Sequence, residues 1–138
     1  MYESIEDALI SDGCERAPAD LSLLIQSMWG GTPTRPAAHV LRRPDLWVLA
    51  GRRQKTLVLV EVKQHARHIP DNDYDPVAQV CNYVSVAREV LDETPFKRLA
   101  LKAMVVAHEI DEDERAHARA ASVECRILVR RTRELRAV

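Results

Sequence analysis

The sequence predicts an α/β domain with a mixed central β-sheet that helices cover on both faces. One observation is a pair of apolar segments, 45–50 and 56–63, which the short link GRRQK joins as an antiparallel hairpin. Another is the order strand, helix, strand in the second half of the chain, which favours parallel pairing. The length of 138 residues suits a single domain, 1–138, with a buried core.

Each element follows from apolar spacing and from the residues that interrupt it. Helical spacing predicts helices at 2–11 and 18–28, which glycines end, and a helix that begins at Pro76 after Asp75. The apolar stripe of this third helix includes Val77, Val80, Cys81, Val84, Ala87 and Leu91. The remaining elements are a short strand at 38–42, a polar loop at 64–75, strands at 99–107 and 124–129, a helix at 112–121 with a capping-box-like start at Asp111 and Glu114, and a basic tail.

Composition limits the classes of function. The chain has 20 basic and 21 acidic residues, so any anionic partner must meet a local basic patch instead of a global positive charge. An apolar share of 46% argues against disorder. No window approaches 18 apolar residues and the amphipathic N-terminus does not resemble a signal peptide, so we expect no membrane segment.

Cysteine usage predicts a cytoplasmic protein. The three cysteines, Cys14, Cys81 and Cys125, are odd in number and form no CxxC pair. This pattern indicates free thiols in a reducing compartment and argues against a disulfide framework or a zinc knuckle.

The hairpin predicts that three charged side chains lie close together. If Ala50 pairs with Thr56, Asp45 lies opposite Glu61, and Lys63 projects from the same face two residues further on. Two adjacent carboxylates repel each other, and a shared proton, the Lys63 ammonium or a divalent cation would relieve the repulsion. A structural interpretation is also open, in which these charges form solvated pairs at strand ends.

These residues resemble a known pattern. Pro44-Asp45 followed by Glu61-Val62-Lys63 on the next strand is similar to the PD-(D/E)xK motif of restriction-endonuclease-like nucleases. Two further features add to the resemblance. Gln79 and Tyr83 match the QxxxY element of RecB-like members, and residues from about 41 to 128 are similar to the nuclease half of the NucS/EndoMS mismatch endonucleases.

The resemblance implies a restriction-endonuclease-like core and a Mg²⁺-dependent nuclease that hydrolyses phosphodiester bonds in DNA as an endonuclease. Asp45 and Glu61 would bind Mg²⁺, or Mn²⁺ as a substitute, with the Val62 carbonyl as a further ligand. Lys63 would hold the attacking water or the phosphate. Gln79 would orient Lys63 or the phosphate, and Tyr83 would contact the nucleic acid.

 Glu6, with Glu3 as the competing candidate, would support the metal site from the first helix.

The resemblance also bears on partners. The mismatch enzymes carry a separate N-terminal DNA-binding and dimerisation domain, whereas fewer than 45 residues precede the motif here, so we do not carry mismatch specificity over. The size is closer to that of archaeal Holliday-junction resolvases, which are single-domain homodimers, and this implies a homodimer or a subunit of a larger complex. An alternative is a nuclease-fold nucleic-acid-binding or regulatory subunit that a partner protein targets.

Two other groups of residues are candidates for binding. Arg42 and Arg43, next to Asp45 in sequence, are the first candidates for phosphate contacts. The hairpin link and the tail supply further candidates: Arg52, Arg53, Lys55, Arg130, Arg131, Arg133 and Arg136. The polar loop holds His65, His68, Asp71, Asp73 and Asp75, but its spacing matches no standard zinc site, so we interpret it as a solvated loop.

Overall fold

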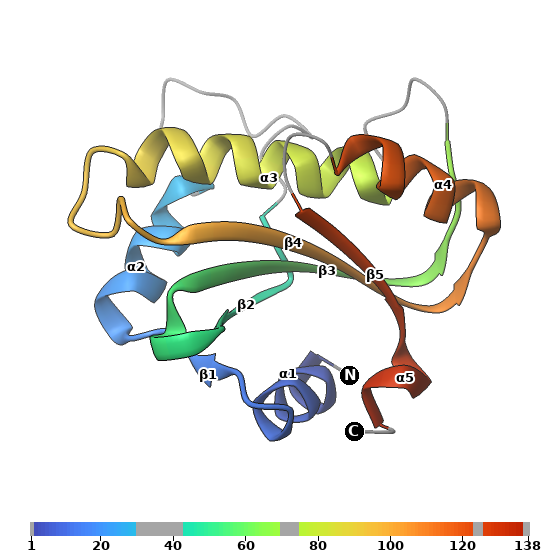
Figure 1. The fold of residues 1–138 in the computed structure, drawn as a ribbon, viewed down its shortest axis with the longest axis horizontal. Helices are drawn as coiled ribbons and strands as arrows, with labels where there is room; N and C mark the ends of the chain where they lie inside the picture. The colour runs from blue at the N-terminus through green and yellow to red at the C-terminus, as the bar shows by residue number, and fades with distance from the viewer. Residues whose placement is uncertain (1, 30–42, 70–74, 123–125, 137–138) are drawn as a thin grey trace.

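The structure, a computed structural model, describes residues 2–29, 43–69, 75–122 and 126–136, with the backbone alone for residues 2, 3 and 136. It confirms the α/β fold with a five-stranded mixed sheet in the order β1-β2-β3-β4-β5 (Figure 1). The strands are β1 (Glu15–Arg16), β2 (Leu46–Ala50), β3 (Thr56–Ala66), β4 (Ala100–Ile110) and β5 (Arg126–Arg131). The helices are α1 (Tyr2–Ser11), α2 (Ala19–Met28), α3 (Pro76–Leu91), α4 (Glu112–Ala121) and α5 (Thr132–Arg136), with a 3₁₀ turn η2 (Arg52–Gln54).

The type of strand pairing changes once across the sheet, from antiparallel to parallel at β3. β1, β2 and β3 pair antiparallel, whereas β3 pairs with β4 and β4 with β5 in parallel. Helices α3 and α4 form the crossovers between the parallel strands, as the strand–helix–strand order predicts. The carboxyl ends of β3 and β4 therefore lie at the same edge of the sheet as the N-terminal ends of α3 and α4.

Helices cover both faces of the sheet (Figure 1). Residues of α2, α3 and α4 form one core with the odd-numbered residues of β3, such as Leu57 and Leu59. Residues of α1 and α5 pack against the opposite face, which the even-numbered residues Val58 and Val60 supply. Because both faces are buried, β3 is apolar along most of its length instead of alternating with polar residues.

The register of the hairpin is the one that the sequence predicts. Ala50 pairs with Thr56 at the link, and Leu46 pairs with Val60 at the other end. Gly51 opens the link with φ of 85°, a conformation that glycine adopts without a steric penalty. The register places the odd-numbered residues of β3 toward α3, which fixes the face on which Glu61 and Lys63 lie.

The structure differs from the sequence-based expectation in several elements. The expectation of a loop from residue 64 is wrong, because β3 continues to Ala66 and pairs there with Ile110 at the end of β4. The two-residue strand β1 and the helix α5 were not predicted. The expected strand at 38–42 lies outside the described residues, as do the first two residues of the expected strand at 124–129. Within the described chain, no helix has both the length and the apolar character that crossing a bilayer requires.

Candidate metal centres

Asp45 lies at the start of β2, where the β2–β3 ladder ends. Its backbone N–H donates to the Val60 carbonyl at 2.9 Å, and its Oδ2 accepts a hydrogen bond from the Val62 N–H at 2.7 Å. The regular ladder stops at Leu46, so beyond this backbone bond it is the side chain of Asp45 that connects the residue to β3. The carboxylate is thereby held beside Glu61 and Val62.

Glu61 is the buried carboxylate of this group, with 4% of its surface exposed. Tyr83 on α3 donates its hydroxyl to Glu61 Oε1 at 3.2 Å. The Lys63 ammonium lies 3.2 Å from Glu61 Oε2. The structure therefore brings together Asp45, Glu61, Lys63 and Tyr83, which the sequence placed far apart along the chain.

The surroundings of Glu61 disfavour its charged form. Burial, and after it the charge of Asp45, raise the pKa of Glu61 to about 7 against the opposing effect of Lys63. Lys63 therefore does not fully offset the two neighbouring carboxylates. A proton or a cation held by Asp45 and Glu61 would supply the missing charge.

Gln79 lies one helical turn before Tyr83 on α3 and is also buried, with 5% of its surface exposed. Neither its Oε1 nor its Nε2 has a hydrogen-bond partner among the described residues. Leaving a buried polar group without a partner costs about 1–3 kcal/mol, so this amide is suited to a ligand or water that approaches from outside the protein. Trp29 packs edge-on against Tyr83, with ring centroids 5.8 Å apart.

The structure does not bring every candidate residue to this group. Glu6 lies on α1, which packs on the opposite face of the sheet, and it pairs with Arg16 at 2.9 Å. The expectation that Glu6 supports the metal site is therefore wrong. The side chain of its competitor Glu3 and the whole of Arg42 lie outside the described residues, whereas Arg43 is exposed two residues before Asp45.

The other basic candidates are spread over the molecule. Arg52, Arg53 and Lys55 lie at the link of the hairpin, at the opposite end of β2 and β3 from Asp45. Arg130 and Arg131 belong to β5, and Arg133 to α5. The side chain of Arg136 lies outside the described residues.

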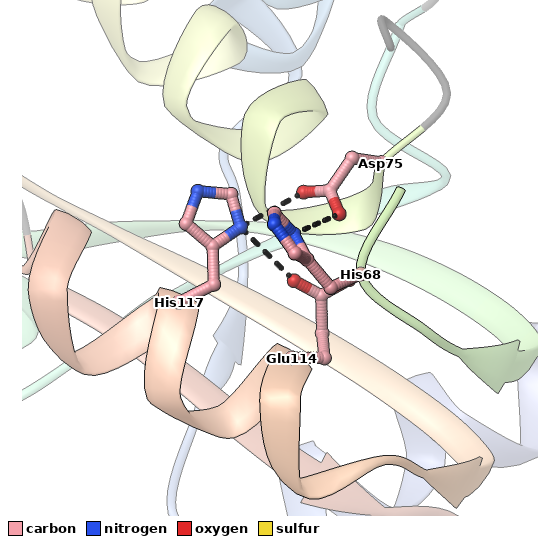
Figure 2. Close-up of side chains that lie close together, drawn as sticks. All are labelled: His68, Asp75, Glu114 and His117. Carbon is pink, nitrogen blue, oxygen red and sulfur yellow. Dashed lines mark hydrogen bonds and ion pairs between the residues drawn. The ribbon is translucent and has the colours of Figure 1, made fainter. Parts of the chain in front are cut away.

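A second cluster of titratable side chains lies at the N-terminal ends of α3 and α4 (Figure 2). It combines His68 and Asp75 with Glu114 and His117, and their potential ligand atoms all lie within 4.8 Å of one another. The interpretation of the 64–75 segment as a solvated loop is therefore wrong for His68 and Asp75, since Asp75 is buried and caps α3. Asp71 and Asp73 lie outside the described residues.

Sequence reasoning missed Glu114 and His117. The signal was present, because a glutamate and a histidine three residues apart project from the same side of a helix. The capping-box interpretation, which assigned Glu114 to the start of α4 as a capping residue, is wrong for the side chains. Glu114 is buried beside Asp75. In the described chain the Asp111 side chain makes no cap bond but contacts His65 Nε2 at 2.6 Å.

Comparison with protein-family models, with curated proteins and with solved structures gives no match to this chain.

Proposed function

We propose that this protein is a Mg²⁺-dependent nuclease that hydrolyses phosphodiester bonds in DNA as an endonuclease. The observation that carries the proposal is the convergence of Asp45, Glu61 and Lys63 at one end of the β2–β3 hairpin. The PD-(D/E)xK resemblance assigns the same three residues to the reaction centre. The fold is compatible with this assignment, since a mixed sheet with helices on both faces is the expected framework.

The donor set fits a hard dication. Two carboxylates and a backbone carbonyl, that of Val62, are the oxygen ligands that Mg²⁺ accepts, and Mg²⁺ usually retains several waters beside them. The shortage of positive charge at Glu61 is consistent with a bound cation. When bound, Mg²⁺ would polarise the phosphate and lower the pKa of the attacking water.

The protein's own groups have separate roles in this proposal. The Val62 N–H fixes the Asp45 carboxylate, and the Tyr83 hydroxyl fixes that of Glu61. The Lys63 ammonium lies close enough to Glu61 to contact a phosphate oxygen bound at the same centre. The charge of Lys63 would there stabilise the negative charge that develops during hydrolysis. The unpartnered Gln79 amide would orient the phosphate or Lys63.

DNA would be held by phosphate contacts. Arg43 is exposed two residues before Asp45, which makes it the described arginine closest in sequence to the proposed centre. We propose the same contact with DNA phosphates for Arg42. One centre cuts one strand, so cleavage of both strands would require a homodimer or a partner subunit.

An alternative proposal is a nucleic-acid-binding or regulatory subunit with the same fold. Both oxygens of Glu61 already have partners, Tyr83 and Lys63, and Glu61 is almost fully buried. In this alternative, the three groups form a buried structural cluster and a partner protein supplies the catalysis.

A cleavage assay on the full chain separates the two proposals. The substrates are supercoiled plasmid and labelled single-stranded, duplex and four-way-junction DNA, each with Mg²⁺, Mn²⁺ or EDTA. We expect cleavage with either metal and none with EDTA, and a loss of at least about 100-fold in rate for Glu61→Gln and Asp45→Asn.

The matched control is Glu109→Gln, which removes an exposed carboxylate from β4 and should leave the rate unchanged. DNA binding without cleavage under every condition would favour the binding subunit. Cleavage that persists in EDTA or in both variants would contradict the proposed centre.

A further inference from the structure

The second cluster draws its four side chains from three parts of the fold. His68 follows the end of β3, Asp75 is the N-cap of α3, and Glu114 and His117 lie on α4 (Figure 2). Figure 2 shows the four side chains pointing toward one another across the space between α3 and α4. The cluster is thus a point at which a single bound ion would connect three elements.

The distances match those between ligands of one ion. His68 Nδ1 lies 3.0 Å from Asp75 Oδ1, and His117 Nδ1 lies 3.2 Å from Asp75 Oδ2 and 3.3 Å from Glu114 Oε1. Two neighbouring atoms that each bind the same zinc ion at about 2.0–2.2 Å are separated by about 2.8–3.6 Å in octahedral or tetrahedral geometry. Small side-chain shifts would bring all four ligand atoms to such an ion.

An independent observation comes from Glu114. Its side chain is fully buried, and its Oε2 accepts no hydrogen bond from any described residue. Its neighbour is the buried carboxylate of Asp75, so two acids face each other away from water. Among the described residues, the ion pairs of these two acids are to His68 and His117.

The remaining groups of Asp75 fix it in place. Its oxygens accept hydrogen bonds from the Ile69 N–H at 2.9 Å and the Ala78 N–H at 3.0 Å. Hydrogen bonds from backbone donors fix the orientation of a carboxylate, as hydrogen bonds to metal ligands generally do. Asp75 is therefore already positioned between the two imidazoles.

The donor types indicate the class of ion. Imidazole nitrogen with carboxylate oxygen suits first-row transition metals, whereas Mg²⁺ and Ca²⁺ prefer oxygen alone. Zn²⁺ imposes no geometry of its own and binds both donors, and four protein ligands are typical of its structural sites.

We propose that His68, Asp75, Glu114 and His117 bind one structural Zn²⁺ ion that ties α3 and α4 to the end of β3. The site is separate from the Asp45–Glu61 centre and does not depend on nuclease activity. Binding uses the Nδ1 lone pair of each imidazole, so the proton that Nδ1 would otherwise donate moves to Nε2 or to solvent.

The test measures binding of Zn²⁺ alone to the EDTA-treated full chain, by calorimetry and by thermal unfolding. We expect one equivalent to bind with a dissociation constant below about 1 µM and to raise the unfolding midpoint by about 5 °C or more. Mg²⁺ and Ca²⁺ at the same concentration should not reproduce the shift. His68→Ala and His117→Ala should each weaken Zn²⁺ binding by at least about 100-fold.

Two controls locate the ion. His108→Ala removes an exposed imidazole from β4 and should bind Zn²⁺ as the wild type does. Asp45→Asn with Glu61→Gln removes the proposed Mg²⁺ ligands and should also leave Zn²⁺ binding intact, so failure of one proposal is distinguishable from failure of the other.

X-ray absorption at the zinc edge of the wild type provides a measurement that does not depend on folding of the variants. Scattering from two imidazoles with oxygen would support the site. The proposal is overturned by an absence of Zn²⁺ binding, by sulfur or oxygen-only coordination, by binding that survives in both histidine variants, or by binding that is lost in the carboxylate double variant.

Discussion

Tyr83 on α3 donates its hydroxyl to Glu61 on β3 at 3.2 Å, which joins the helix to the carboxylate of the proposed Mg²⁺ centre. The bond orients one oxygen of a buried acid, while Lys63 contacts the other. Helix packing and the orientation of a proposed metal ligand therefore depend on the same side chain.

Tyr83→Phe tests this relationship. The change leaves Glu61 Oε1 without its hydroxyl donor, so we expect a loss of about 1 kcal/mol in the free energy of unfolding and about a 10-fold fall in cleavage rate. Chemical denaturation and the plasmid assay measure the two effects. Ser85→Ala, an exposed change on the same helix, is the control; an equal fall in rate in that variant would contradict a role for the hydroxyl.

Lys63→Met separates metal binding from cleavage. Lys63 lowers the pKa of Glu61, so its removal leaves the two carboxylates less neutralised and should preserve or tighten Mn²⁺ binding. Cleavage should nevertheless fall by at least about 100-fold, because the charge that stabilises the reacting phosphate is gone. Calorimetry with Mn²⁺ and the cleavage assay give the two values, and a parallel loss of both would show that Lys63 acts only through the metal.

The pH dependence of stability follows from Glu61. Its pKa is about 7 in the folded protein against an ordinary value of 4.5, so the folded state binds more protons between these two values and loses stability as the pH rises through them. The difference amounts to about 3 kcal/mol for this residue. In EDTA, Glu61→Gln should match the wild type near pH 4.5 and exceed its stability at pH 8.

Urea denaturation of both proteins in EDTA at the two pH values measures this difference. Burial and the neighbouring Asp75 raise the pKa of Glu114 to about 8, which adds a loss in the same direction that both proteins share. A stability difference between the two proteins that does not change with pH would contradict the burial of charge at Glu61.

We expect Gln79→Met to raise the stability of the protein and to lower its cleavage rate. The amide is buried without a described partner, so an apolar side chain of similar length should raise the free energy of unfolding by about 1–3 kcal/mol. Cleavage should fall, because the group proposed to orient the phosphate or Lys63 is lost. Thermal unfolding and the cleavage assay are the measurements; a variant that is less stable than the wild type would show that the amide has a structural partner.

The local pattern of the chain was sufficient to predict the hairpin and the group built on it. Apolar residues on both faces and a short link defined the register, and the register brought Asp45 close to Glu61. The departure of Asp45 from the ladder could not be predicted, because it depends on one side-chain bond to the Val62 N–H. Similarly, the polar residues Gln64 and His65 gave no sign that β3 continues to Ala66, because pairing with β4 stabilises this last part of the strand.

The second cluster required information that no local pattern contains. His68 and Asp75 are separated from Glu114 and His117 by a helix and a strand, and their meeting depends on how α4 packs beside α3. Glu6 is the opposite case. Its position in the sequence was compatible with the proposed metal site, but the packing of α1 places it on the other face of the sheet.

Helix α3 begins at the Asp75 cap and reaches Tyr83 two turns later, about 12 Å along its axis. One continuous helix therefore connects the two groups of acids, with Gln79 midway along it. If an ion bound at the cap restrains the position from which Tyr83 reaches Glu61, thermodynamic reciprocity requires that a ligand at Glu61 change the affinity at the cap by the same factor.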